Sequence, residues 1–201
     1  DEVVVTVLVD NSYDSLLSDS GPAVRAAHGR TTPVPAAQFV EGHTVPGLRA
    51  EHGFSALVTV REGTVSRSLL LDTGITPDGM VVNADRLGID LTSIETVVLS
   101  HGHYDHTGGL LHLVDRCGDL PLLLHPLAWT RRRIVRPGAP VRNLPTLHRP
   151  ALEDAGYVIT EHEGPTLLLD GTVLVTGQIE RTSGFERGMP CHEAYQDGTW
   201  V

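Results

Sequence analysis

Residues 101–106, His-Gly-His-Tyr-Asp-His, gather three imidazoles and one carboxylate within six positions. They directly follow an apolar run that predicts a β-strand, whose end would carry these side chains into one loop. Neutral imidazole and carboxylate are the ligands that a borderline divalent ion such as zinc prefers. His101 and His103 can serve one ion while Asp105 and His106 serve a second. The spacing therefore favours a dinuclear metal site of the kind that hydrolyses substrates.

A solvent-exposed, histidine-rich turn without any ligand is the alternative interpretation of the same residues. Gly108 and Gly109 argue against it, because glycines allow the backbone to turn tightly and enter the helix that is predicted over Gly109–Cys117. We therefore treat the segment as a metal-binding loop.

The pattern His-x-His-x-Asp-His after a β-strand resembles the signature of the metallo-β-lactamase superfamily. The order of the motifs along the chain is similar to one branch, the dihydropterin ribofuranosyl-aminobenzene phosphate synthase-like metallo-hydrolases. The motifs that carry this resemblance are Ala50-Glu51-His52-Gly53-Phe54-Ser55, Leu70-Leu71-Asp72-Thr73-Gly74, the segment Ser100–Leu110, and Thr176-Gly177-x-Ile179-x-Arg181. The similarity runs from about Val5 to the last residue.

The resemblance implies an α/β fold, the αββα sandwich of the superfamily, with residues 1–201 forming one domain. It implies a metal-dependent hydrolase or water-assisted transferase that acts on a small ester, phosphoester or related heterocyclic substrate. The expected metal ligands are His101, His103, Asp105 and His106, and Asp105 is also the expected catalytic residue because its carboxylate can orient a water molecule. Two zinc ions are expected, with manganese or iron as alternatives.

Asp72 lies where the predicted strand Ser68–Leu71 ends, and in the superfamily an aspartate of this motif supports the metal loop. A metal-binding histidine needs its second ring nitrogen held, and a nearby carboxylate does this while it raises the basicity of the ligand. The alternative is an aspartate that only caps a turn.

Three further residues are candidates for substrate binding. Glu51 and His52 form a doublet that could hold a substrate or shuttle protons beside a metal. Arg181 follows a predicted strand and could clamp a phosphate or carboxylate. An ordinary ion pair with Glu180 or Glu186 is the alternative for Arg181.

A complete site in the resembling family also needs a third histidine, a bridging aspartate and a final histidine. Gln178 occupies the place where many relatives have a histidine, and His192 is the late candidate that remains. We therefore expect a chain that lacks the C-terminal part of the domain and retains the first half of the sandwich with part of the second. The alternative function is a non-catalytic metal-binding fragment or interaction protein. Because a half-sandwich exposes an apolar sheet face, we expect a homo-oligomer or pairing with the missing C-terminal segment.

Composition narrows the kinds of partner that the chain is expected to bind. The net charge is −10, and the 15 basic residues are all arginine. An acidic chain predicts neither nucleic acid nor membrane as partner. The resemblance implies a small-molecule substrate, and we expect a cytoplasmic location. The one basic cluster, Arg131-Arg132-Arg133, is predicted to lie on the solvent face of a short helix over Ala128–Arg133, with phosphate binding as the alternative. The run Val3–Val9 is predicted to be a buried strand.

Overall fold

The computed structural model describes residues 1–14, 16–25, 32–186 and 188–201. Its main sheet has six strands in the order β1-β4-β5-β6-β7-β10. β1, β4 and β5 are antiparallel neighbours, whereas β5, β6, β7 and β10 run parallel to one another. The strands are β1 (Glu2–Val9), β4 (Ser55–Glu62), β5 (Val65–Leu71), β6 (Ile94–Val98), β7 (Leu120–Leu124) and β10 (Tyr157–Glu161). The β4–β5 pair is the hairpin that the sequence predicts.

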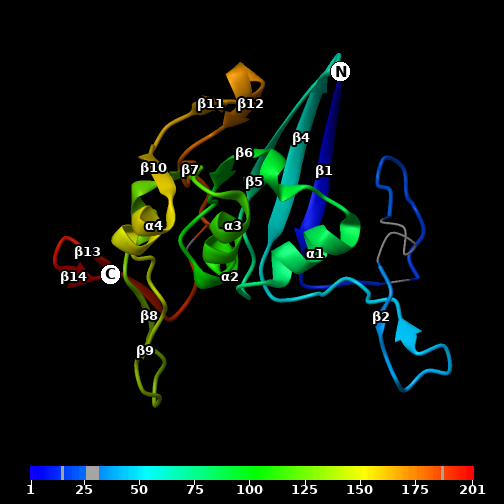
Figure 1. The fold of residues 1–201 in the computed structure, drawn as a ribbon. Helices are drawn as coiled ribbons and strands as arrows, with labels where there is room; N and C mark the ends of the chain where they lie inside the picture. The colour runs from blue at the N-terminus through cyan, green and yellow to red at the C-terminus, as the bar shows by residue number, and fades with distance from the viewer. Residues whose placement is uncertain (15, 26–31, 187) are drawn as a thin grey trace.

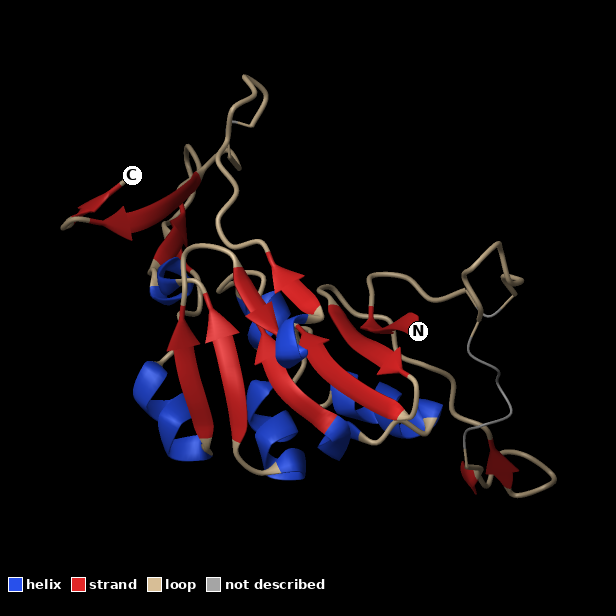
Figure 2. Cartoon of the chain, turned by 90° about the horizontal axis from the view of Figure 1, so that it is seen from above, coloured by secondary structure: helices blue, strands red, loops and turns tan. Residues whose placement is uncertain are grey.

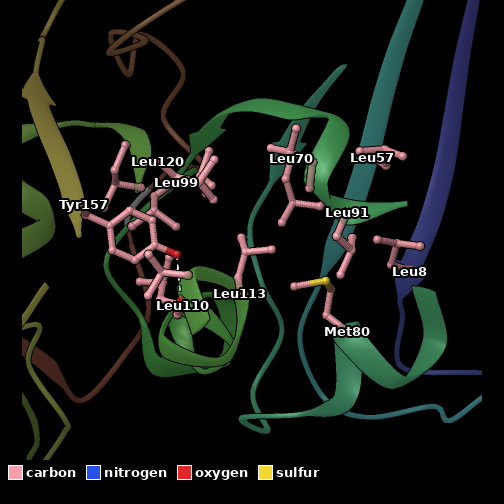
Figure 3. Packing of buried hydrophobic residues seen from close by; sticks show 14 of the residues in the cluster. Leu8, Leu57, Leu70, Met80, Leu91, Leu99, Leu110, Leu113, Leu120 and Tyr157 are labelled. Atoms are coloured by element: carbon pink, nitrogen blue, oxygen red, sulfur yellow. Dashed lines mark hydrogen bonds between the residues drawn. The ribbon is translucent and has the colours of Figure 1, made fainter. Parts of the chain in front are cut away.

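Helices cover one face of this sheet (Figures 1 and 2). They are α1 (Gly79–Leu87), α3 (Leu110–Cys117) and α4 (Arg149–Ala155), while the single turn of α2 (Tyr104–Thr107) belongs to the predicted metal-binding loop. The apolar side chains of the helices pack on residues that the sheet directs toward them, as Leu113 and Met80 do beside Leu70 (Figure 3). Tyr157 is buried in the same cluster and donates a 2.7 Å hydrogen bond from its hydroxyl to the carbonyl oxygen of Leu110.

The opposite face of the sheet is covered in part by a small hairpin. β11 (Thr166–Leu168) and β12 (Val173–Val175) are joined through a short 3₁₀ turn (Leu169–Gly171). Leu169 packs there against Leu69, Val98 and Leu123. Successive side chains of β5, β6 and β7 are therefore buried on opposite faces of the sheet. This explains why these strands are almost continuously apolar. The predicted α/β layering is confirmed.

The remaining strands lie outside the main sheet. β8 (Arg132–Ile134), β9 (Arg142–Asn143), β13 (His192–Gln196) and β14 (Thr199–Trp200) form a second sheet in the order β14-β13-β8-β9. β2 (Val34–Pro35) and β3 (His43–Thr44) pair in the segment that extends away from the main sheet beside β1 (Figure 1). Two 3₁₀ turns, Leu91–Ser93 and Pro126–Trp129, complete the elements. Among the described residues, no helix has the length and apolar character needed to cross a bilayer.

Two predicted elements are wrong. The structure has a 3₁₀ turn and then strand β8 where a helix is predicted over Ala128–Arg133, because pairing with the distant strand β13 outweighs local preference. β1 is an edge strand rather than a buried one. Its side chains at Val3, Val5 and Val7 are 65%, 59% and 46% exposed, since the β11–β12 hairpin leaves this part of the face open.

Candidate metal centre

The predicted metal-binding loop begins directly after β6, at the edge of the sheet where the parallel strands end. Ser100 starts the loop, Asp72 follows β5, and His125 follows β7. In parallel sheets the carboxyl ends of neighbouring strands meet at one edge, and ligands bind in the crevice outside it. Residues that lie far apart in the sequence are brought together here by strand order alone.

Asp72 is the anchor of the loop. Its side chain is buried, and its backbone has a positive φ of 56°. Its carboxylate accepts hydrogen bonds from the backbone N–H of Ser100 at 2.8 Å and from the Ser100 hydroxyl at 2.6 Å. The Nδ1 atom of His106 donates a third hydrogen bond to it, at 2.8 Å. The structure therefore places Asp72 against a predicted metal ligand and leaves Nε2 of His106 to face outward.

The three loop histidines lie in mutual contact. The rings of His101 and His106 have their centroids 4.2 Å apart, and Nε2 of His101 lies 3.0 Å from Nδ1 of His103. Burial lowers the pKa of His101 to about 4, with help from the nearby charges of His106 and His103. Burial also lowers the pKa of His103, whereas the hydrogen bond to Asp72 raises the pKa of His106. His101 and His103 are thus kept in the neutral form in which imidazole binds metals.

The donor set fits a zinc-type ion in its chemistry, since imidazole nitrogens and a carboxylate oxygen are the ligands of such sites. In the part of the chain that the structure describes, no group of three or more His, Cys, Asp or Glu side chains is already arranged to hold an ion.

Asp105 lies at the start of α2 with its side chain 16% exposed. Its Oδ2 atom is 3.6 Å from Nε2 of His106 and 3.2 Å from Nε2 of His52. His52 therefore reaches the metal-binding loop from the segment that precedes β4.

Glu51 has a different environment from the one expected of a substrate ligand. Its Oε1 atom accepts the backbone N–H groups of Ile75 and Thr76 at 3.0 and 3.1 Å, and its Oε2 atom accepts the Thr76 hydroxyl. The carboxylate thereby holds the turn that follows Asp72. Substrate binding by Glu51 and His52 stays a prediction.

Gly108 allows the loop to lie directly on the turn after β5. A Cβ atom at this position would lie 2.0 Å from the carbonyl oxygen of Ile75. The same contact includes a 2.8 Å hydrogen bond from the N–H of Gly108 to the carbonyl oxygen of Gly74. Thr73 and His106 add a second backbone hydrogen bond of 2.8 Å. The loop is thus fixed by its main chain as well as by Asp72.

The second sheet brings Arg132 and His192 toward the loop, although the sequence predicts a solvent-facing helix for Arg132 and names His192 only as a late candidate for a missing histidine. The register pairs His192 with Ile134 and Ala194 with Arg132, so His192 and Arg132 share one face of this sheet. Both charges contribute to lowering the pKa of His103, after the larger effect of burial. Arg132 is held by the carbonyl oxygens of Thr130 and Leu127, at 3.0 and 2.9 Å. Only the long-range pairing of β8 with β13 could have revealed this arrangement.

Arg181 lies in the exposed segment between β12 and β13. Its charge is the smallest of the influences that lower the pKa of Glu186, the largest being a hydrogen bond from Ser183. The contacts of the described residues do not bring Arg181 to the metal-binding loop. Its role as a substrate ligand stays a prediction.

A cleft of about 250 Å³ borders the loop at Ser100. It lies between the ends of the parallel strands and the β11–β12 hairpin, and its lining includes Val98, His125, His162 and Thr176. Gln178, which stands where relatives of the resembling family have histidine, lies with its Oε1 atom 3.1 Å from Nε2 of His125. The cleft therefore combines apolar walls with imidazole groups at its rim.

The family model of the metallo-β-lactamase superfamily matches residues 48–128, which contain Asp72 and the whole metal-binding loop. This part of the chain is similar to that superfamily. The chain is also similar to the 7,8-dihydropterin-6-methyl-4-(beta-D-ribofuranosyl)-aminobenzene-5'-phosphate synthase of Methanocaldococcus jannaschii, with 33% identity over 78 residues. That match covers 38% of this chain and 26% of the synthase. The predicted superfamily and the resemblance to this branch are confirmed.

A second curated relative is the beta-lactamase-like protein 2 homolog of Drosophila melanogaster, with 28% identity over 154 residues, covering 62% of this chain and 51% of the relative. The chain thus spans about a quarter to a half of the curated relatives that it matches. Among solved structures, the subclass B3 metallo-β-lactamase MEM-A1 from a soil metagenome library aligns with a TM-score of 0.38 and 19% identity. This alignment covers 62% of this chain and 46% of that structure.

Proposed function

We propose that this chain acts as a metal-dependent hydrolase or water-assisted transferase. One observation carries the proposal. Three imidazoles and a carboxylate, those of His101, His103, Asp105 and His106, lie close together at the edge where the parallel strands end, and Asp72 holds the ring of His106 by a hydrogen bond. Such an ion, when bound, polarises a carbonyl or phosphoryl oxygen and makes water a nucleophile near neutral pH. Zinc is the proposed metal, with two ions in a complete site and manganese or iron as alternatives.

In this proposal, side chains of the protein orient the water molecule, hold the predicted metal ligands and bind the substrate. Asp105 directs Oδ2 toward His52 and His106, and we assign to its Oδ1 atom the hydrogen bond that orients the attacking water. Asp72 holds Nδ1 of His106 so that Nε2 faces the ion. We assign to the cleft beside Ser100 the binding of part of the substrate.

A small phosphorylated or carboxylated substrate is the proposed class. Arg132 is anchored to two carbonyl oxygens and faces the side of the loop that carries His103, where a guanidinium can bind an anionic oxygen pair. The named product of the similar synthase contains a phosphate ester, which supports the same class. A cleft of about 250 Å³ suits part of such a molecule rather than a polymer.

A second candidate is a metal-binding segment without catalytic activity. The observation in its favour is that the donors of the described residues are not already arranged around one point. Hydrolysis of chromogenic phosphodiester and ester probes by the zinc-loaded chain separates the two candidates, because only the first predicts turnover that a chelator abolishes.

Metal content tests the ligand assignment directly. We expect that His103→Ala removes tight binding of one ion, because the first metal position loses one of its two imidazoles from the loop. Elemental analysis after dialysis measures this as a fall in bound zinc per chain. His112→Ala is the matched control, since His112 lies on the exposed side of α3. Unchanged zinc content in His103→Ala would contradict the assignment.

A further inference from the structure

The second sheet is built without an apolar core of its own. Its strands β14, β13, β8 and β9 are two to five residues long, and the sheet stands beyond the edge of the main sheet (Figure 2). Neither of the buried apolar clusters formed by the described residues includes a residue of these strands. Short strands that bury no apolar face are marginally stable. We therefore expect this sheet to open more easily than the main sheet.

Stacked arginine and aromatic side chains hold one face of the second sheet. The Cζ atom of Arg131 lies 4.1 Å from the ring centroid of Tyr195, and that of Arg133 lies 4.1 Å from the ring centroid of Trp200. Arg133 also pairs with Glu193 at 2.6 Å. All five side chains are exposed or half-buried, and contacts of both kinds are weak where water reaches them. They order the sheet without fixing it firmly to the rest of the chain.

The opposite face of the second sheet carries Arg132, a half-buried cation that has no carboxylate partner among the described residues. Its guanidinium donates to the carbonyl oxygens of Thr130 and Leu127, which joins the sheet to the 3₁₀ turn before β8. A guanidinium has further N–H donors beyond these two. Burial lowers the pKa of Arg132, and a cation that is partly removed from water is costly unless an anion pairs with it.

The face that carries Arg132 also carries His192 and is turned toward His103 of the predicted metal-binding loop. We propose that the second sheet is a lid over this side of the loop, and that it closes on an anionic group of the ligand, a phosphate or a carboxylate. The inference rests on the proposed function, since this anion would belong to the substrate. It adds a moving element, the second sheet, and names Arg132 as the residue through which the anion acts.

An anion favours the closed lid for an electrostatic reason. In an open lid the guanidinium of Arg132 is hydrated and attracts an anion weakly. In the closed lid the same group is partly removed from water, where opposite charges attract each other more strongly. The anion therefore has a higher affinity for the closed state, and this difference in affinity shifts the equilibrium toward it.

The two tryptophans of the chain allow the lid to be observed separately from the main sheet. Trp129→Phe leaves Trp200 of β14 as the fluorescent reporter of the second sheet. Urea unfolding of this variant of the full chain, without metal, is followed by fluorescence and by far-ultraviolet circular dichroism. We expect the fluorescence to change at a lower urea concentration, because the lid opens before the main sheet unfolds. Coincident transitions would overturn the inference.

Inorganic phosphate tests the anion in the same variant. Compared with sodium chloride at equal ionic strength, phosphate should move the fluorescence transition to higher urea and leave the circular dichroism transition in place. Adding Arg132→Gln should abolish this shift. Adding Arg136→Gln, which removes an exposed arginine just beyond β8, should preserve it.

Three results would overturn the role of the anion. They are the absence of a shift with phosphate, a shift of equal size in both transitions, and a shift that persists with Arg132→Gln. Because the chain is free of metal in these measurements, the lid is tested independently of the proposed function. A chain that responds to phosphate as expected but binds no zinc would contradict the proposed function and leave the lid in place.

Discussion

Asp72 shows how one buried carboxylate organises the chemistry of several neighbours. It accepts three hydrogen bonds, two from Ser100 and one from His106. Each of these donors belongs to the metal-binding loop, so the position of the loop depends on both oxygen atoms of Asp72. The sequence motif predicts this partnership, but the role of Ser100 as the second contact appears only in the structure.

Replacing Asp72 with Asn tests this dependence. One acceptor oxygen becomes an amide donor, so a hydrogen bond of Ser100 or of His106 is lost while the volume is preserved. We expect a loss of stability of about 1–3 kcal/mol because a buried donor is left unsatisfied. Zinc affinity should fall roughly 10- to 100-fold.

Urea unfolding of the metal-free chain measures the first effect, and calorimetric zinc titration measures the second. Asp115→Asn is the matched control, because Asp115 lies on the exposed side of α3. If Asp72→Asn behaves like this control in both measurements, Asp72 does not support the loop.

The metal-binding loop keeps its shape through close backbone contacts with the turn after β5. Gly108 is the position where this contact is tightest, since a Cβ atom would lie 2.0 Å from a backbone oxygen. Backbone cannot move aside as a flexible side chain can, so any larger residue must displace the loop.

Gly108→Ala should therefore destabilise the chain by about 1–3 kcal/mol, the usual cost of overpacking. It should also weaken zinc binding, because the displaced loop carries the ligands. Chemical unfolding and zinc titration provide the measurements. Gly47→Ala is a suitable control, because a Cβ atom at Gly47 would have its nearest neighbour 3.9 Å away, in the ring of Tyr13. Equal stability of the two variants would contradict a tight loop contact.

The strand β8 illustrates a limit of local sequence patterns. Residues 128–133 favour a helix by their local pattern, yet Arg132–Ile134 forms a strand because β13, about sixty residues later, supplies the hydrogen-bonding partner. The same pairing turns Arg132 toward the metal-binding loop rather than toward solvent. A predicted solvent-facing arginine thus becomes a candidate for anion binding.

Among the described residues, the edge strand β1 presents an exposed row of apolar side chains. Val3, Val5 and Val7 lie on the same side of β1, the edge strand of the main sheet, and the β11–β12 hairpin does not cover them. Exposed apolar strands at a sheet edge are ready to pair with another chain. This arrangement supports the expectation of a homo-oligomer, with a second copy of the chain as the partner.

We predict that the chain associates with itself in a concentration-dependent manner. Sedimentation velocity over a hundredfold range of concentration measures the association. Threonine at Val3, Val5 and Val7 keeps the branched shape that suits a strand while it adds a hydroxyl, and should shift the chain toward monomer. As a control, Val158→Thr alters an exposed valine on the opposite edge strand, β10. A monomer at every concentration would contradict the prediction.

The sequence by itself determined the chemical character of the site. Residue types and spacing within residues 101–106 are local properties, as are the glycines that follow and the apolar run before them. The β4–β5 hairpin and helix α3 were predictable for the same reason, since short-range periodicity and turn residues specify both.

Only the tertiary structure decided which distant groups meet those residues. His52 reaches Asp105, Arg132 and His192 face the same loop, and Glu51 holds the turn that follows Asp72. These placements depend on strand order and on pairing between segments that lie tens of residues apart. No local pattern encodes such contacts, because their free energy comes from burial and hydrogen bonds that exist only once the chain is folded.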